Sequence, residues 1–195
     1  MNSIKIKHLA AIGACKYQLQ LIPSEPLYSL ILELKEKYRQ AFGWNLYANA
    51  QPHMSLTGFY LEKEKETAAI QAIETHILQT SIQLQTAGLS FFEESKVLHL
   101  AVANTAQTQK LKEALLLLSN GKGLFQQKLF QISPLFHLSI AKAKNKESAT
   151  DLLSLGNDFQ DLNFFPEEIV LKRKTIGGSW ENCHRFPIKD KVGAR

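Results

Sequence analysis

The sequence predicts an α+β fold with antiparallel sheets, and two observations carry this prediction. Runs with the two-residue alternation of strands and runs with the spacing of amphipathic helices both recur along the 195 residues. Some strand-like runs follow one another across short turns, which is typical of antiparallel hairpins. Since no low-complexity segment or long linker interrupts the chain, we expect one domain over residues 1–195, with a frayed tail at 189–195.

The first half of the chain contains strand-like and helical runs in turn. Residues 17–22 (YQLQLI) alternate as a strand does. A turn with two prolines follows, and Ser24 is a candidate N-cap for a helix over 27–42, which Gly43 closes. The apolar residues of that helix recur at helical spacing, as Leu27, Leu30, Ile31, Leu34 and Tyr38. After a loop and an apolar strand, a charged amphipathic helix is expected over 62–79.

The second half begins with two strands, over 82–92 and 97–103, joined as a hairpin by the turn-like residues between them. A leucine-rich helix follows over 108–118, and Asn120-Gly121 ends it. A second loop then leads into a second apolar strand. The remaining elements are a helix over 148–159 and strands over 169–176 and 180–188, and a glycine-rich turn separates these two strands.

Two short motifs stand out, His53-Met54-Ser55 and His137-Leu138-Ser139, which lie 84 residues apart in similar apolar, strand-like runs. Residues i and i+2 of a strand point to the same face, so each histidine shares a face with its serine. On the same alternation, Thr57 shares the face of the first motif. The apolar residues between them can anchor each strand in the core, which leaves an imidazole and a hydroxyl exposed.

Two imidazoles across a cleft can divide the work of splitting a phosphodiester. One takes a proton from the attacking water, and the other protonates the leaving oxygen. Imidazole titrates near neutral pH, so both protonation forms are available at once. The hydroxyls can donate hydrogen bonds to the non-bridging phosphate oxygens, where negative charge builds up. The other four histidines have no hydroxyl residue two places later and do not fit this pattern.

In these motifs, and in the order of its elements from about residue 16 to 188, the chain resembles the 2H phosphoesterase superfamily, named for two His-x-Ser/Thr motifs. The resemblance implies a bilobal fold in which two antiparallel sheets flank a central groove and helices pack outside. It implies His53 and His137 as catalytic residues, with Ser55 and Ser139 holding phosphate oxygens. It also implies His137 as the base and His53 as the acid, whereas the residues themselves leave these roles open.

Members of this superfamily include RNA 2′,3′-cyclic phosphodiesterases and 2′-5′ oligoadenylate phosphodiesterases. The resemblance therefore implies that the chain hydrolyses the 2′,3′-cyclic phosphate of a nucleotide or RNA end. Cleavage of linear 2′-5′ or 3′-5′ oligonucleotides is the first alternative. The second is a non-catalytic module that binds RNA on the same scaffold.

Five further residues are candidates for contact with the substrate. Tyr17 begins the first strand, and Lys172 and Lys174 share one face of a later strand, where each ammonium can reach a phosphate. Trp44 flanks the first motif and can stack on a nucleobase. Thr57 lies one step beyond Ser55 and can line the groove. For each of them, packing or exposure to solvent is the alternative.

Composition bounds the partners and the compartment. The net charge of +5 and the pI of about 9.1 suit an anionic substrate such as an RNA end, and a generic basic surface explains them equally well. Cys15 and Cys183 make neither a zinc signature nor a disulfide framework, which favours a reducing cytoplasm. No acidic or cysteine cluster accompanies the motifs, so we expect no metal and no cofactor.

No apolar run approaches the ~20 residues of a membrane-spanning helix. We therefore expect a cytoplasmic monomer that acts on a nucleotide or RNA end without binding a membrane. Residues 1–15 weakly resemble a bacterial lipoprotein signal. However, Lys5, Lys7 and His8 leave an apolar core of about six residues there, below the usual range of ~7–15.

Overall fold

The computed structural model of the chain describes residues 13–43, 47, 49–78, 82–121, 123–142, 153–154, 159, 161–175 and 177–188. Several expectations fall outside these ranges. They are the tail at 189–195, most of the segment that resembles a lipoprotein signal, most of the helix expected over 148–159, and Trp44.

The described strands pair in antiparallel fashion in the order β7-β3-β4-β6-β2-β1-β8-β9, with the short β5 added to β2. Their bounds are β1 Ala14–Pro23, β2 Met54–Glu62, β3 Leu84–Phe92, β4 Val97–Val102, β5 Gln131–Ile132, β6 His137–Lys142, β7 Asn163–Phe164, β8 Pro166–Lys174 and β9 Trp180–Pro187.

The predicted helices are present where the structure describes them. Helix α2 has the predicted bounds, Leu27–Phe42. Its N-cap position is occupied by Pro26 without a side-chain hydrogen bond, so the prediction of Ser24 as the cap is wrong. Ser24 contributes its backbone carbonyl, which accepts from the amide of Tyr28. The other helical segments are η1 Lys63–Lys65, α3 Glu66–His76, α4 Ala106–Ser119 and η2 Gln127–Leu129.

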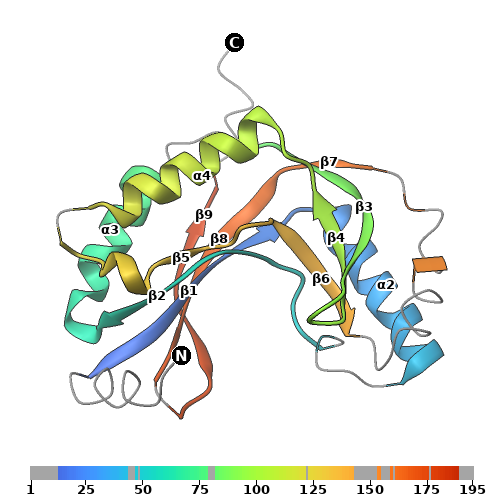
Figure 1. Ribbon diagram of the computed structural model, residues 1–195, viewed down its shortest axis with the longest axis horizontal. Coiled ribbons are helices and arrows are strands. Elements are labelled where there is room, and N and C mark those ends of the chain that lie inside the picture. Colours follow the sequence, from blue (N-terminus) through green and yellow to red (C-terminus); the bar gives the residue numbers. More distant parts are fainter. Residues whose placement is uncertain are drawn as a thin grey trace.

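The sheet has two parts that meet at a narrow seam (Figure 1). Strands β1, β2, β8 and β9 form one part, and β3, β4 and β6 form the other. The recorded pairing of β2 with β6 is a single pair, Met54 with Leu138. The predicted α+β fold with two antiparallel sheets is thus confirmed, with the sheets joined at this seam.

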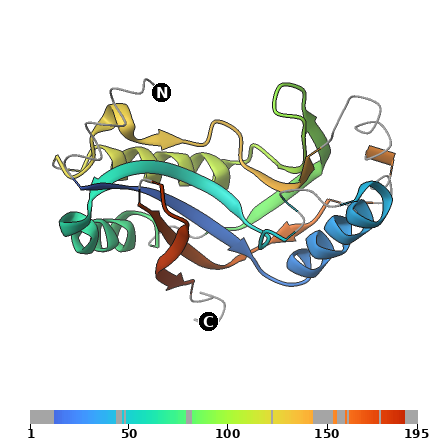
Figure 2. The ribbon, with the colours of Figure 1, turned by 90° about the horizontal axis from the view of Figure 1, so that it is seen from below.

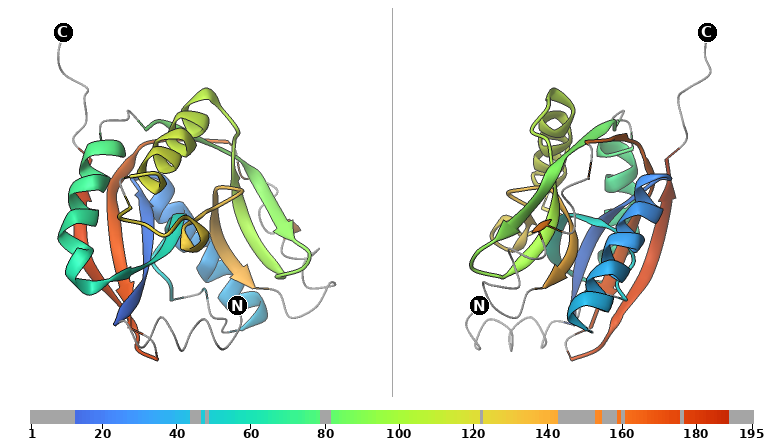
Figure 3. Two further views of the ribbon diagram at one scale, coloured as in Figure 1. Left: turned by 60° about the vertical axis from the view of Figure 1, so that its left-hand side comes forward. Right: turned by 90° about the vertical axis from the view of Figure 1, so that its right-hand side faces the viewer.

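The sheet is curled rather than flat, as the side views show (Figure 3). Seen from below, the long strands β1 and β2 run side by side through the molecule (Figure 2). Helices α3 and α4 contact each other, and α2 packs on β6 and β1. None of the helices within the described ranges is long and apolar enough to cross a membrane.

Alternation along β1 separates the core from the opposite face of the sheet. Tyr17, Leu19 and Leu21 are fully buried, whereas Lys16 is exposed and Gln18 is half-buried. The Tyr17 hydroxyl donates to Glu66 at the start of α3 at 2.9 Å. The face that carries Tyr17 therefore packs against α3, and the face that carries Lys16 and Gln18 is left open for a site.

Candidate active site

The two His-x-Ser motifs meet at the seam between the two parts of the sheet. Met54 and Leu138, the central residues of the motifs, pair across β2 and β6 and are both fully buried. Counting one residue outward from this pair in the antiparallel sense sets His53 across from Ser139 and Ser55 across from His137. Residues that flank a paired couple point to the face opposite that couple, so these four side chains leave the core on the same side. His137 is near enough for its charge to lower the pKa of His53. The fold thus gathers two imidazoles and two hydroxyls on one face.

Both imidazoles are anchored in the same way. The Nδ1 of His53 donates to the carbonyl of Gln51 at 2.7 Å, and the Nδ1 of His137 donates to the carbonyl of Leu135 at 2.9 Å. A carbonyl oxygen only accepts, so Nδ1 carries the proton in both rings. The Nε2 atom of each ring is therefore the one that can accept or release a proton at a substrate.

His53 lies in a surrounding that disfavours its cation. Burial lowers its pKa below the ordinary value, and the positive charges of Lys172, Lys35 and His137 lower it further, while the hydrogen bond to Gln51 acts in the opposite direction. Lys35 reaches this region from α2 and donates to the carbonyl of Ala50. Burial lowers the pKa of Lys35 to about 8.

His137 is surrounded by rings instead. Its imidazole meets Phe92 edge-on, with centroids 4.9 Å apart, and meets His99 in the same manner at 5.2 Å. His99 itself is buried, stacks on Phe92 at 3.8 Å and pairs with Ser139 across β4 and β6. Burial lowers the pKa of His99, and the charge of His137 lowers it further. His99 is thus a packed residue, and its Nδ1 donates to the carbonyl of Val97 at 3.3 Å.

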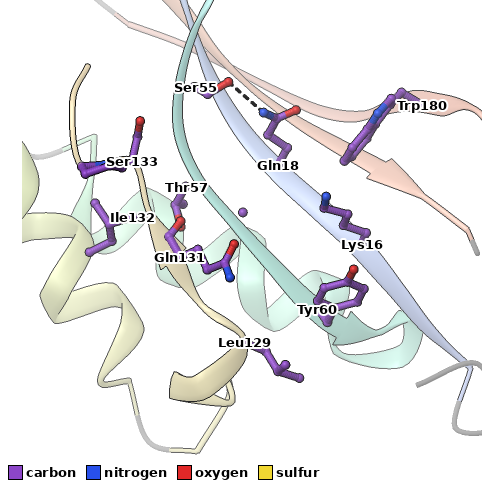
Figure 4. A pocket seen from close by; sticks show the side chains of 12 residues that line it. Lys16, Gln18, Ser55, Thr57, Tyr60, Leu129, Gln131, Ile132, Ser133 and Trp180 are labelled. Carbon is purple, nitrogen blue, oxygen red and sulfur yellow. Dashed lines mark hydrogen bonds between the residues drawn. The ribbon is translucent and has the colours of Figure 1, made fainter. Parts of the chain in front are cut away.

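Ser55 is held by a chain of glutamines that the sequence analysis did not single out. Gln20 donates through Nε2 to Gln18 at 3.0 Å, and Gln18 donates through Nε2 to Ser55 Oγ at 2.7 Å (Figure 4). Because Ser55 Oγ accepts this bond, its own proton is available for a ligand. The signal for these residues was present, since Gln18 and Gln20 are the polar alternates of YQLQLI.

Tyr17 and Thr57 both neighbour core residues, and only Tyr17 is turned away from the site. Tyr17 points into the core, where its ring stacks on Phe59, so it does not reach the face of the two motifs. The pairing of β1 with β2 skips Leu56, so Gln20 pairs with Ser55 and Leu19 pairs with Thr57. This β-bulge pairs Thr57 with a core residue, while Thr57 still lines the same cavity as Ser55.

Of the other predicted contacts, Thr57 and the two lysines have neighbours that the structure defines. Thr57 is buried and donates to the carbonyl of Gln131 at 2.8 Å, so it holds β5 while lining the edge of a cavity. Lys172 and Lys174 pair with Gln18 and Lys16, which puts both lysines on the open face. Burial lowers the pKa of Lys172, and the charge of Arg185 lowers it further. Trp44 lies outside the described residues.

Two cavities open beside the motifs. One, of about 310 Å³, includes Ser55 and Gln18 in its lining, and the other, of about 330 Å³, includes His137 and Ser139. Within the described residues no group of three or more His, Cys, Asp or Glu side chains is placed to hold a metal ion. The residues beside these cavities are two imidazoles, two hydroxyls and nearby cations, groups that can bind a phosphate and exchange protons with it.

Comparison with known families agrees with this chemistry. Residues 23–175 match the family model described as the 2′-5′ RNA ligase superfamily. The chain belongs to this family of 2H phosphoesterases. Membership supports a phosphodiesterase-type function for the chain. No curated protein matches the chain in sequence.

Solved structures share the fold at low sequence identity. Escherichia coli LigT, crystallised with 3′-AMP, superimposes with a TM-score of 0.55 at 13% identity, covering 91% of this chain and 99% of LigT. The Thermus thermophilus protein TT0787 superimposes with a TM-score of 0.56 at 16% identity, covering 90% of this chain and 99% of its own. A protein described as a phosphoesterase gives 0.52 at 14% identity, with coverage of 90% and 99%.

Proposed function

We propose that this chain hydrolyses the 2′,3′-cyclic phosphate of a nucleotide or RNA end without a metal ion, by general acid–base catalysis from His53 and His137. The observation that carries the proposal is the pairing of Met54 with Leu138, which brings the two motifs to one face. The identical anchoring of both rings through Nδ1 adds to it, because each Nε2 is then the atom available to the substrate.

The reaction proceeds in one displacement at phosphorus. A water oxygen attacks the phosphorus atom, and His137 takes the proton of that water through Nε2. The bond between phosphorus and one ribose oxygen breaks, and His53 gives its Nε2 proton to that oxygen. The product is a ribose monophosphate with one free hydroxyl. Ser55 and Ser139 donate hydrogen bonds to the non-bridging oxygens as their charge grows.

The acid role of His53 depends on the substrate. In the free protein, burial lowers the pKa of His53, so the ring is mostly neutral at neutral pH. An anionic phosphate beside the ring favours the imidazolium form and raises that pKa. Binding of the substrate thus charges the ring that has to protonate the leaving oxygen.

The choice of substrate has independent support. The family description refers to RNA, and E. coli LigT, whose fold the chain shares, has been crystallised with 3′-AMP, a nucleoside carrying a 3′-phosphate. Lys172 lies close enough for its charge to affect His53, and an ammonium there suits an anionic substrate.

A panel assay in EDTA tests the proposal. The purified protein is incubated with nucleoside 2′,3′-cyclic phosphates and with linear 2′-5′ and 3′-5′ dinucleotides. We expect turnover of the cyclic compounds that EDTA leaves unchanged and that His53→Ala and His137→Ala each reduce about a hundredfold or more. Turnover confined to the linear dinucleotides would move the assignment to an oligonucleotide phosphodiesterase. Losses below about tenfold in both variants would contradict catalysis by these histidines.

A further inference from the structure

The larger part of one cavity is not used by the proposed reaction. The cavity of about 310 Å³ touches the catalytic groups only at Ser55 and extends from there along β1 and β2 (Figure 4). At its far end stand Lys16, Tyr60 and Trp180. Trp180 is 39% exposed, and the ammonium of Lys16 lies 5.9 Å from the centroid of its ring.

The strand register explains why these side chains gather. Lys16 pairs with Tyr60 on one side and with Lys174 on the other, and Lys174 pairs with Trp180. Directly paired residues share a face, so Tyr60, Lys16, Lys174 and Trp180 form one row across four strands. We call this row the distal row.

The distal row is too far along the strands to serve the reacting phosphate. Lys16 lies four residues before Gln20, which pairs with Ser55, and four residues of a strand span about 13 Å. The Lys16 ammonium is also directed to Trp180 rather than to Ser55. Lys172 pairs with Gln18, between the distal row and Ser55. It lies nearer to His53 and is the cation placed for the reacting phosphate. The cations of the distal row are therefore placed for a different anion.

The second cavity leaves a place for the nucleoside that carries the reacting phosphate. It is lined by Phe92, His137 and Ser139, and Ser133 and Pro134 line both cavities, so the two cavities adjoin at these residues. A nucleoside 2′,3′-cyclic phosphate has one nucleoside attached to its phosphate, and this occupies one cavity. The other is filled only by a substrate that continues beyond that nucleoside.

We propose that the distal row is a subsite for the preceding nucleotide, so that the substrate is an RNA strand ending in a cyclic phosphate rather than a free cyclic nucleotide. In this arrangement the base of that nucleotide stacks on Trp180. Lys16 and Lys174 bind the phosphate that links it to the terminal nucleoside. Exposed aromatic faces beside cations are how proteins bind single strands without sequence readout. This inference rests on the proposed function.

The first experiment varies chain length. The kcat/KM values for a nucleoside 2′,3′-cyclic phosphate and for a dinucleotide ending in the same cyclic nucleotide are compared at low salt. We expect the dinucleotide to react with a kcat/KM about tenfold higher, which corresponds to ~1.4 kcal/mol, within the range for one stacked base. Equal values for the two substrates would overturn the inference.

The second experiment tests the named residues through the dinucleotide-to-mononucleotide ratio. Trp180→Ala should bring that ratio close to one, whereas Phe165→Ala, which truncates an aromatic ring of similar exposure (41%), should leave it unchanged. Lys16→Ala should lower the ratio and reduce the slope of log kcat/KM against log salt by ~0.7, the value for one phosphate contact to a single strand. The matched control is the exposed Lys110→Ala. Ratios that no variant changes would contradict the subsite.

Direct binding separates this inference from the proposed function. Calorimetry compares a nucleoside 3′-phosphate with a dinucleotide carrying the same 3′-phosphate, and it requires no turnover. About tenfold tighter binding of the dinucleotide, lost in Trp180→Ala, supports the subsite even if catalysis by the histidines is disproved. Equal binding of the two ligands refutes the subsite and leaves the proposed function intact.

Discussion

The two His-x-Ser motifs have the same local geometry and unequal surroundings. In both, Nδ1 donates to the carbonyl two residues earlier in the chain. His53, however, lies beside Lys35 and Lys172 and is desolvated, whereas His137 has Phe92 and His99 as ring neighbours. A repeated motif can therefore present two identically anchored rings while the neighbouring strands and helix give them different surroundings.

The serines differ in the same way. Ser55 accepts a hydrogen bond from Gln18, which is itself fixed by Gln20, so this hydroxyl is oriented before a ligand arrives. Ser139 is instead the register partner of His99 on the neighbouring strand β4. The first motif is thus tuned by charge and hydrogen bonds, and the second by ring packing. Four experiments probe this contrast.

The largest effect should come from the histidines together. His53→Ala and His137→Ala should each lower kcat/KM by about 10²–10⁴, since each removes a proton-transfer group from one displacement. The double variant should be little worse than the poorer single variant, because residues that act as a unit are not additive. Steady-state kinetics on the cyclic substrate measure all three. Fully multiplicative losses would show that the rings act in separate steps.

Loss of the Ser55 hydroxyl, and of the Gln18 amide that orients it, should have smaller effects of different size. Ser55→Ala should cost about 10²–10³ in kcat, the usual effect of losing one donor to a developing oxyanion. Gln18→Ala leaves the hydroxyl but frees its orientation, and we expect a loss of ~2- to 12-fold, equivalent to one hydrogen bond. If Gln18→Ala were as damaging as Ser55→Ala, Gln18 would itself have to contact the phosphate.

The pH profile tells which role His53 has. An acid must be protonated in the free enzyme, so kcat/KM should fall about tenfold per pH unit above the pKa of His53, which burial holds below ~6.5. Lys35→Met removes a positive charge near the ring and should move this midpoint to higher pH. The pH profiles of the two proteins should be compared below about pH 8, where Lys35 is charged. A rate that instead falls as pH decreases through the same midpoint would make His53 the base.

The smallest effect should come from the ring packing of the second motif. His99→Ala removes the edge contact to His137 and should lower kcat ~2- to 12-fold, as expected for an aromatic pair. His99→Phe should restore most of the loss, because it supplies a ring without a titratable group. Failure of this rescue, with a changed pH profile, would show that the imidazole of His99 acts through its protonation.

The sequence was sufficient for what depends on local periodicity. The bounds of α2, the hairpin of β3 and β4, and the shared face of each histidine with its serine all follow from spacing along the chain. The meeting of the motifs was expected only from the family resemblance, because it depends on a pairing between residues 84 apart that periodicity does not encode.

What the sequence could not predict depends on register. Thr57 was expected to line the groove and does line the cavity of Ser55, but its pairing with the core residue Leu19 depends on one extra residue in β2. Tyr17 was considered as a ligand contact, but the pairing of β1 with β2 turns it toward Phe59 in the core. Trp180 was seen only as the start of a strand, and it joins Lys16 because β8 lies between them. Such juxtapositions across strands require the fold.

A crystal structure with a uridine–vanadate complex, which mimics the transition state at phosphorus, would show whether both histidines act on one phosphorus atom. We expect Nε2 of His53 and Nε2 of His137 each to lie within about 3.2 Å of an oxygen on the same vanadium atom, on opposite sides of it. Vanadate held by one histidine alone, with the other ring beyond hydrogen-bond reach, would contradict this expectation.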